Sequence, residues 1–318
     1  MSALASTSPV ERARALAGEL LRPVAEQVDR TVVPRSHLDA IGALGLLGLA
    51  GPRSHGGAQV APAVVREVTE ELAGACGATW FVSAQHATPL AVLTGSENAP
   101  LRDRLLPGMC AGEVLAGVAV AHLRRPGPPA VTATRTPGGW RFEGRIGWMT
   151  GWGICDVVLL AGLTDDGRTV QVLVPARDAP GLTAGPPLAL AAMQASRTVA
   201  LQLDGLVVTD DEVASVWPTS EWSTADTAKT ANAGPHTFGL QREAVRRLDE
   251  LAARRGDGTA AALAEQLRRE GERLRRVAYV LLDDVPAQEQ VQDRLAVRAS
   301  ALEPVSYTHL TLPTKRIV

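Results

Sequence analysis

The stretch GGWRFEGRIGWMTGWGICDVVLLAG, residues 138–162, contains three of the six tryptophans of the chain, namely Trp140, Trp148 and Trp152. A Pro-Gly-Gly turn signal begins just before it, and the segments WRFEG and DVVLLAG within it are typical of short β-strands. Large aromatic side chains dominate burial in most proteins. Spacing alone therefore favours Trp148 as a core indole and Thr150 as an ordinary strand threonine.

Further strand patterns lie on both sides of this stretch. Apolar residues alternate with a period of two, and glycine and proline separate the segments. The segments are VLAGVAVA (114–121), AVTATRT (130–136), TVQVLVPA (169–176) and TVALQLDGL (198–206). These patterns predict a middle β-domain over residues 113–212, built as an antiparallel sandwich or barrel.

Helical periodicity replaces the strand pattern on either side of this domain. The N-terminal part, residues 1–112, predicts an all-α domain with helices at 13–28, from Ser36 as N-cap, from Pro62, over 78–93 and over 101–106. The C-terminal part, residues 213–303, predicts helices around 244–252, 263–281 and 286–302. The expected fold class is therefore α+β, with an incomplete C-terminal helical bundle and no internal repeat.

The overall composition is that of a globular chain. It has 318 residues, 46% hydrophobic and 21% charged, with a formal net charge of −2. This balance argues against nucleic acid or a membrane surface as a partner, and no apolar run is long enough to span a bilayer. We expect a cytoplasmic protein. The scattered histidines form no metal site, and the three separated cysteines are expected to be buried small residues: Cys76, Cys110 and Cys155.

The last residues differ from the rest of the chain. Nearly all basic residues before them are arginines, whereas the end reads VSYTHLTLPTKRIV. This ending resembles translated adapter sequence. We therefore expect residues 304–318 to be a non-native tail and the natural chain to continue past Glu303.

The α–β–α order and four motifs resemble the acyl-CoA dehydrogenase superfamily from about residue 10 to residue 303. The motifs are, in chain order, GPRSHGG (51–57), RLLPGMCAGEVLAGVAVA (104–121), GGWRFEGRIGWMTGWGICDVVLLA (138–161) and LQLDGLVVTDDEV (201–213). The resemblance implies FAD as cofactor, with the isoalloxazine ring beside Trp148, Met149 and Thr150. It also implies a flavin contact at the end of the preceding strand, at Val120, Ala121, His122 and Leu123. Trp140 and Trp152 inherit no such role and are expected to be core or dimer-contact residues.

The chain departs from the family pattern directly after this strand. Where the family has Thr-Glu-Pro followed by Gly-Ser-Asp, this chain has HLRRPGPPA (122–130). His122 takes the place of the threonine, where it could donate to the flavin O2 or N1 edge or hold negative charge on reduced flavin. The alternative is a histidine that packs at a strand end. Arg124 and Arg125 could contact phosphate, although exposed loop arginines are the favoured interpretation.

The catalytic base that the family requires is a carboxylate that removes the α-proton of an acyl thioester. In most members it lies near the C-terminus, which here means beyond Glu303. A minority of members place it at a position that corresponds to Thr227 here, which makes the neighbouring Asp226 a weak candidate. The favoured interpretation of Asp226 is a solvated loop aspartate. Glu113 resembles a structural glutamate. The Arg-x-x-Phe-Gly motif, which reaches FAD of a neighbouring subunit, is reduced to Arg254 and Arg255.

The resemblance implies an acyl-CoA dehydrogenase-like flavin oxidoreductase of fatty acid metabolism. Its reaction would be α,β-dehydrogenation of acyl-CoA or a related acyl thioester, with hydride transfer to FAD N5. A homodimer or homotetramer and an electron acceptor such as a flavoprotein are implied as partners. Two alternatives stay open: a flavin monooxygenase of the same fold that uses reduced flavin, and a non-catalytic subunit. The acyl chain that it accepts is not encoded in any single motif.

Overall fold

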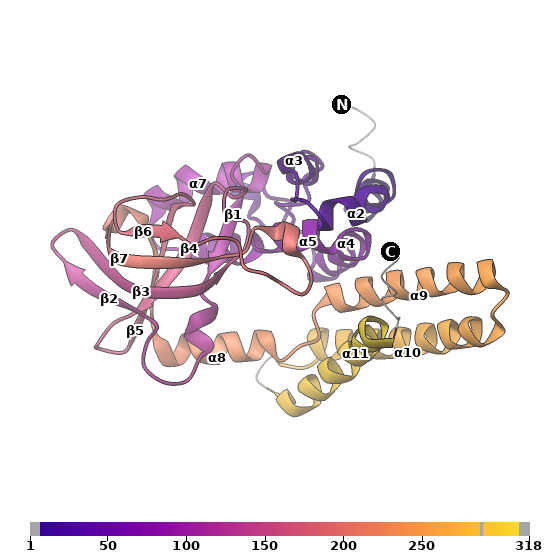
Figure 1. Cartoon of the computed structure of the whole chain (residues 1–318). Helices are drawn as coiled ribbons and strands as arrows, with labels where there is room; N and C mark the ends of the chain where they lie inside the picture. The colour runs from indigo at the N-terminus through magenta and orange to yellow at the C-terminus, as the bar shows by residue number, and fades with distance from the viewer. Residues whose placement is uncertain (1–6, 287–288, 312–318) are drawn as a thin grey trace. The chain divides into compact units, whose positions relative to one another are not determined.

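The computed structural model describes residues 7–286 and 289–311, and the chain within these ranges forms two compact units (Figure 1). The first unit contains Met1–Val68 and Cys76–Ser223, and the second contains Thr69–Ala75 and Thr224–Val318, each over its described residues. The α–β–α order of the predicted fold class is confirmed. The domain boundaries after residues 112, 212 and 303 stay predictions.

The helices of the first unit begin with three consecutive segments that bury one apolar face. Ser8 caps the first of them, because its Oγ accepts from the Glu11 N–H at 3.2 Å while the Glu11 carboxylate accepts from the Ser8 N–H. The helices in chain order are α1 (Pro9–Leu16), η2 (Ala17–Leu21), α2 (Arg22–Asp29), α3 (Arg35–Ala43), η3 (Arg53–His55), α4 (Pro62–Ala75), α5 (Gly77–Ala84), α6 (Ala87–Thr94) and α7 (Ala99–Ala111).

Two helix predictions were wrong in detail. Ser36 lies inside α3, because the helix begins one residue earlier and Pro34 occupies the N-cap position. The single helix expected over 78–93 is divided into α5 and α6 at His86. The buried His86 ring bonds outward to two other elements, accepting from the Ala116 N–H at 3.1 Å and donating to the Met109 carbonyl at 3.2 Å. It thereby ties α7 to the first strand.

The middle of the first unit is one eight-stranded sheet with the order β6-β7-β3-β2-β4-β5-β8, in which β1 pairs with β4. The strands are β1 (Ala116–Ala119), β2 (Val131–Thr136), β3 (Gly139–Met149), β4 (Val157–Leu163), β5 (Arg168–Pro175), β6 (Leu182–Ala184), β7 (Val199–Thr209) and β8 (Val213–Pro218). The sheet is mixed and not purely antiparallel, because β1 and β2 both pair with β4 in parallel. The sequence patterns missed the edge strands β6 and β8.

The hydrophobic core of this unit joins α6 and α7 to the sheet. Strand β4 is buried along nearly its whole length, since its residues from Val158 to Gly162 are shielded from solvent. A buried cluster contains Leu90 and Leu93 of α6, Leu101, Leu106 and Met109 of α7, and Ala116, Leu159 and Leu173 of the sheet. Burial of each such leucine side chain contributes about 2 kcal/mol, so this cluster holds β1 and β4 in place.

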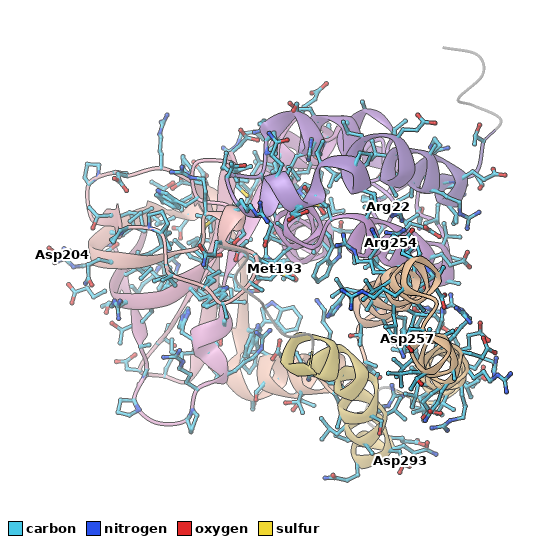
Figure 2. All side chains as sticks on the ribbon, turned by 45° about the vertical axis from the view of Figure 1, so that its right-hand side comes forward. Arg22, Met193, Asp204, Arg254, Asp257 and Asp293 are labelled. Carbon is cyan, nitrogen blue, oxygen red and sulfur yellow. The ribbon has the colours of Figure 1, made fainter. Side chains whose placement is uncertain are left out.

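The second unit is helical. It contains the end of α4, most of α8 (Thr219–Thr230), α9 (Pro235–Arg255), α10 (Gly258–Asp283) and α11 (Val291–Thr311). Asp257 begins α10 by accepting from the Thr259 and Ala260 N–H groups at 3.0 Å, at the turn that follows Arg254 on α9 (Figure 2). The predicted tail falls partly on α11, and residues 312–318 lie outside the described residues.

We expect Gly151→Ala to destabilise the protein more than Gly167→Ala. Both glycines have positive φ, +87° and +80°, so alanine costs about 1 kcal/mol at either position. At Gly151 the added Cβ would also lie 2.7 Å from Cys155 Sγ, whereas nothing lies within 4 Å of it at Gly167. Denaturant unfolding of both variants measures the difference, expected to be a further 1–3 kcal/mol, roughly, for Gly151→Ala. Equal losses of unfolding free energy in the two variants would show that the bend after Thr150 is not tightly packed.

Candidate functional site

Two sequence segments that were predicted to contact flavin lie side by side in the first unit. Gly117 of β1 is so close to the end of β3 that a Cβ on it would meet Met149 Cε at 2.5 Å and the Thr150 carbonyl at 3.4 Å. Farther along, a Cβ on Gly147 would lie 3.9 Å from Arg125 Nη2. The end of β1 with the turn after it, and the end of β3 with the bend after it, therefore form one candidate site.

Trp148 presents its indole to solvent at this site. It is 40% exposed, whereas the next residue, Met149, is fully buried against β1. Successive side chains of a strand point to opposite faces, so β3 turns Met149 inward and Trp148 outward. The interpretation of Trp148 as a core indole is therefore wrong. Of the other tryptophans, Trp152 is buried, and Trp140 is half-buried beneath the Arg135 guanidinium at 5.1 Å from its ring centroid.

Thr150 follows the end of β3 and belongs to a chain of three buried hydroxyl groups, which we name the hydroxyl chain. Thr150 Oγ1 lies 3.0 Å from Thr198 Oγ1, which lies 2.8 Å from Ser196 Oγ. Each of the three residues is at most 1% exposed. Three hydroxyls carry three protons but make two bonds among themselves, so one proton of the hydroxyl chain is left for another acceptor. Thr150 is one of the two ends of the hydroxyl chain.

The backbone around Ser196 holds the hydroxyl chain in place. The Gly151 N–H donates to the Ser196 carbonyl at 2.9 Å, and Arg197 Nε donates to the Trp152 carbonyl at 2.9 Å. Arg197 and Met193, which is labelled in Figure 2, both adopt left-handed backbone conformations, with φ of 49° and 60°. Sequence reasoning did not single out Ser196 or Thr198, because only folding brings them beside Thr150.

His122 lies in the short helix η4 (Ala121–Arg124) and not on a continued strand. The residue is 7% exposed, and its Nε2 donates to the Ala161 carbonyl at 3.1 Å. Because a carbonyl oxygen can only accept, Nε2 carries the ring proton and Nδ1 is a bare acceptor. Nδ1 is buried and has no hydrogen-bond partner among the described residues. Burial lowers the pKa of His122 to about 4, and the positive charge of Arg125 adds to this effect, so the ring is neutral at pH 7.

The residues around His122 divide between the core and the surface. Val120 is buried and Leu123 packs partly against the core cluster, whereas Ala121 is exposed. Arg124 and Arg125 are both exposed, as expected, although Arg124 lies at the end of η4 and not in a loop. The site therefore combines an exposed indole, a buried hydroxyl end, a buried acceptor nitrogen and a nearby cation.

The structure identifies no catalytic base. Side chains from Glu303 onward lie outside the described residues, so the favoured position is not tested. Asp226 lies on α8 and is partly exposed, which corrects its interpretation as a loop residue. Glu113 is exposed after the end of α7. Glu70 is buried in the second unit, but Arg275, Tyr279 and Arg242 donate to its oxygens at 2.7, 2.5 and 3.2 Å, so it serves as an ion-pair centre.

The described part of the chain contains neither a metal-binding cluster nor a reactive thiol. No three His, Cys, Asp or Glu side chains gather there as a metal site would require. The three cysteines are free and buried as predicted, and burial raises the pKa of Cys155 to about 12, which keeps its thiol protonated and unreactive. Every helix of the described chain is too short or too polar to cross a bilayer.

Comparison with known proteins supports the sequence resemblance. A model of the N-terminal domain of acyl-CoA dehydrogenases matches residues 8–113. Benzylmalonyl-CoA dehydrogenase of Aromatoleum aromaticum is 24% identical over 197 residues, which cover 60% of this chain and 52% of that protein. The chain thus spans about half the length of this curated relative.

Solved structures share the fold. A probable acyl-CoA dehydrogenase of Mycobacterium abscessus superposes with a TM-score of 0.79 at 16% identity, over 94% of this chain and 85% of that one. Dibenzothiophene monooxygenase of Paenibacillus sp. A11-2 superposes with a TM-score of 0.73 at 19% identity, over 94% of this chain and 82% of that one. The predicted resemblance to the acyl-CoA dehydrogenase superfamily is confirmed.

Removal of the central hydroxyl of the hydroxyl chain is expected to destabilise the first unit. Thr198→Val keeps the shape of the side chain but leaves the Thr150 and Ser196 hydroxyls buried without this partner, which costs about 1–3 kcal/mol. Thr134→Val, on an exposed position of β2, is the matched control and should change little. Denaturant unfolding gives both values. The double variant Thr150→Val/Thr198→Val should lose less than the sum of the single variants, and strict additivity would contradict the coupling.

Acid should weaken the fold through His86. Burial lowers its pKa from the ordinary 6.5 to about 4, so between these pH values the unfolded chain binds a proton that the folded chain does not. Stability is therefore lost as the pH falls through this window, by about 2 kcal/mol between pH 7 and pH 5. Unfolding of the wild type and of His86→Gln at both pH values isolates this residue, because other groups cancel. If the stability of the wild type and of His86→Gln changed equally with pH, His86 would not be the source of the acid sensitivity.

Proposed function

We propose that this chain, which resembles the acyl-CoA dehydrogenase superfamily in sequence and fold, is a flavin-dependent oxidoreductase that holds FAD at the ends of β1 and β3. The observation that carries the proposal is the meeting of two chain segments there. One supplies the exposed Trp148 beside the buried Thr150 hydroxyl, and the other supplies the unpartnered His122 Nδ1. A flat heteroaromatic ring stacks favourably on an exposed indole such as that of Trp148.

The residues that would hold FAD are Val120–Leu123 and Trp148–Thr150. The Trp148 indole would cover part of the ring and exclude water from it, since aromatic rings stack favourably. The Thr150 hydroxyl, held by Thr198, would meet a polar edge of the ring. FAD supplies the capacity to accept a hydride when it is bound. The protein contributes orientation, shielding and hydrogen bonds.

The reaction that we propose is the α,β-dehydrogenation of an acyl thioester such as an acyl-CoA. Support comes from the family match and from a relative whose name states that it acts on benzylmalonyl-CoA. The proton-abstracting carboxylate would lie beyond Glu303, with Asp226 as the weaker candidate. We further propose a cytoplasmic homodimer or homotetramer that passes electrons to a flavoprotein acceptor.

A flavin monooxygenase is the second candidate. The likeness in fold to dibenzothiophene monooxygenase favours it, whereas the loss of the Thr-Glu-Pro and Gly-Ser-Asp motifs at HLRRPGPPA is compatible with either candidate. The two candidates differ in a simple assay. A dehydrogenase loses its flavin absorption when an acyl-CoA is added, whereas a monooxygenase consumes O₂ only when reduced flavin is supplied. A non-catalytic subunit would do neither.

The first experiment is the visible absorption spectrum of the full chain after incubation with FAD and desalting. We expect a retained flavin band. Trp148→Ala should weaken FAD binding about tenfold, because stacking contributes roughly 0.5–1.5 kcal/mol beyond simple burial. Trp217→Ala is the matched control, since Trp217 is 38% exposed on β8, which pairs with β5 and with neither β1 nor β3. A folded protein that retains no flavin would count against the proposal.

A further inference from the structure

A second cluster of polar side chains lies at the motif GPRSHGG (51–57), which the proposed flavin site does not use. Ser54 Oγ lies 2.9 Å from Nδ1 of His55, and Nε2 of the same ring lies 3.0 Å from Asp103 Oδ1. Ser54 and His55 belong to the short helix η3, whereas Asp103 belongs to α7. Folding thus joins a hydroxyl, an imidazole and a carboxylate in one hydrogen-bonded line.

The carboxylate sets the direction of the hydrogen bonds in this line. An ionised carboxylate can only accept, so Nε2 of the neutral ring carries the proton and donates to Asp103. Nδ1 is then a bare acceptor, and the Ser54 hydroxyl donates to it. A hydroxyl that donates to an imidazole, which a third group orients in turn, is the arrangement that activates serine as a nucleophile.

The turn that carries Ser54 and His55 is held by its own backbone. The His55 N–H donates to the Pro52 carbonyl at 3.0 Å. A Cβ on Gly57 would meet the Gly51 carbonyl oxygen at 2.2 Å, so the two ends of the motif lie in contact. The hydroxyl and the imidazole are therefore positioned before any reagent arrives, which lowers the entropic cost of a reaction between them and that reagent.

The serine is open to solvent. Ser54 is exposed, and the His55 side chain is 18% exposed. A reagent can therefore approach the Ser54 oxygen from solution. The Asp103 side chain is 66% exposed, and Arg102 Nε lies 3.7 Å from the same carboxylate oxygen that His55 contacts. Because water screens such a carboxylate, the main effect of Asp103 is to orient the ring.

The backbone around Ser54 limits the reaction that it can perform. The Gly56 N–H donates to the Arg53 carbonyl at 3.1 Å, and the Gly57 N–H donates to the Pro52 carbonyl at 3.0 Å. These two amides are therefore not available to stabilise an oxyanion, which is a large part of the catalysis of acyl transfer in many enzymes. The arrangement suits acyl donors that carry a good leaving group.

We propose that Ser54 is an acyl-acceptor site for activated acyl donors, namely thioesters and aryl esters. Ser54 Oγ forms a bond to the acyl carbonyl carbon, and its proton passes to His55 Nδ1. The bond from this carbon to the thiol sulfur or aryl oxygen breaks, and the proton passes on to the leaving group. The products are an O-acylated serine and a free thiol or phenol. The reaction requires neither flavin nor an oxidant, so it does not rest on the proposed oxidoreductase function.

The test treats the full chain, without FAD, with p-nitrophenyl acetate and in parallel with acetyl-CoA. We expect an acetyl ester on Ser54, located by peptide mass spectrometry and removed by alkaline hydroxylamine, which cleaves esters and spares lysine amides. Ser54→Ala should lose this ester. Ser223→Ala is the matched control, because Ser223 is exposed on α8 and has no neighbouring histidine in the sequence, so acetylation of Ser54 should be unchanged.

Variants of the other two residues test the hydrogen-bonded line itself. His55→Phe should slow acetylation of Ser54 by roughly a hundredfold or more, since a positioned general base contributes about 10²–10⁴-fold. Asp103→Asn should slow it by about threefold, because the contribution of an exposed carboxylate is screened by water. Asp103→Glu should restore the rate. Circular dichroism shows whether each variant is folded.

Three results would overturn the inference. Equal rates of acetylation at Ser54 in the wild type and in the folded variants His55→Phe and Asp103→Asn would show that Ser54 reacts as an ordinary exposed hydroxyl. Release of p-nitrophenol by Ser54→Ala at the wild-type rate would identify another group as the nucleophile. A folded wild type that forms no ester on Ser54 with either reagent would exclude the site altogether.

Discussion

The parallel pairing of β1 with β4 is the constraint on which the candidate site depends. Asp156, just before β4, fixes this pairing at its start: its Oδ2 accepts from the Leu115 N–H at 2.7 Å, and its Oδ1 accepts from Arg35 Nη1 at 3.0 Å. The adjacent pair Ala116 and Val157 then begins the ladder, which runs to Ala119 and Leu160. Where the ladder ends, the chain turns into η4 and places the His122 ring against the Ala161 carbonyl. A shift of this register would move His122 away from its partner.

The same placement explains why a strand of four residues suffices to build one side of the site. Gly117 has no side chain, so β1 can approach β3 closely enough for Met149 to fill the space beneath it. With Met149 buried, the alternation of the strand turns Trp148 outward, and the bend at Gly151 brings Thr150 to Thr198. The end of β3 and the residue after it thereby present an apolar ring and a buried hydroxyl within three residues.

The hydrogen-bond donors and acceptors of the site are held by rigid parts of the fold. Thr150, Thr198 and Ser196 are shielded from solvent, and His122 is held by a carbonyl of the buried strand β4. Groups in such surroundings do not reorganise freely, so their polarity is set before a ligand arrives. In contrast, the arginines after His122 are exposed and can adapt to a ligand.

The sequence by itself determined the α–β–α order, most of the strands, the superfamily resemblance and the two segments that meet at the site, because periodicity and local motifs are properties of neighbouring residues. It did not reveal the edge strands β6 and β8, which are short and lack a clear pattern, or the division at His86, which depends on partners in α7 and β1. Only the tertiary structure decided that Trp148 is exposed, that Ser196 and Thr198 lie behind Thr150, and that His122 donates through Nε2 to the Ala161 carbonyl and keeps Nδ1 as an acceptor. Each of these depends on atoms distant in the chain, such as the Ala161 carbonyl, whose position no local pattern encodes.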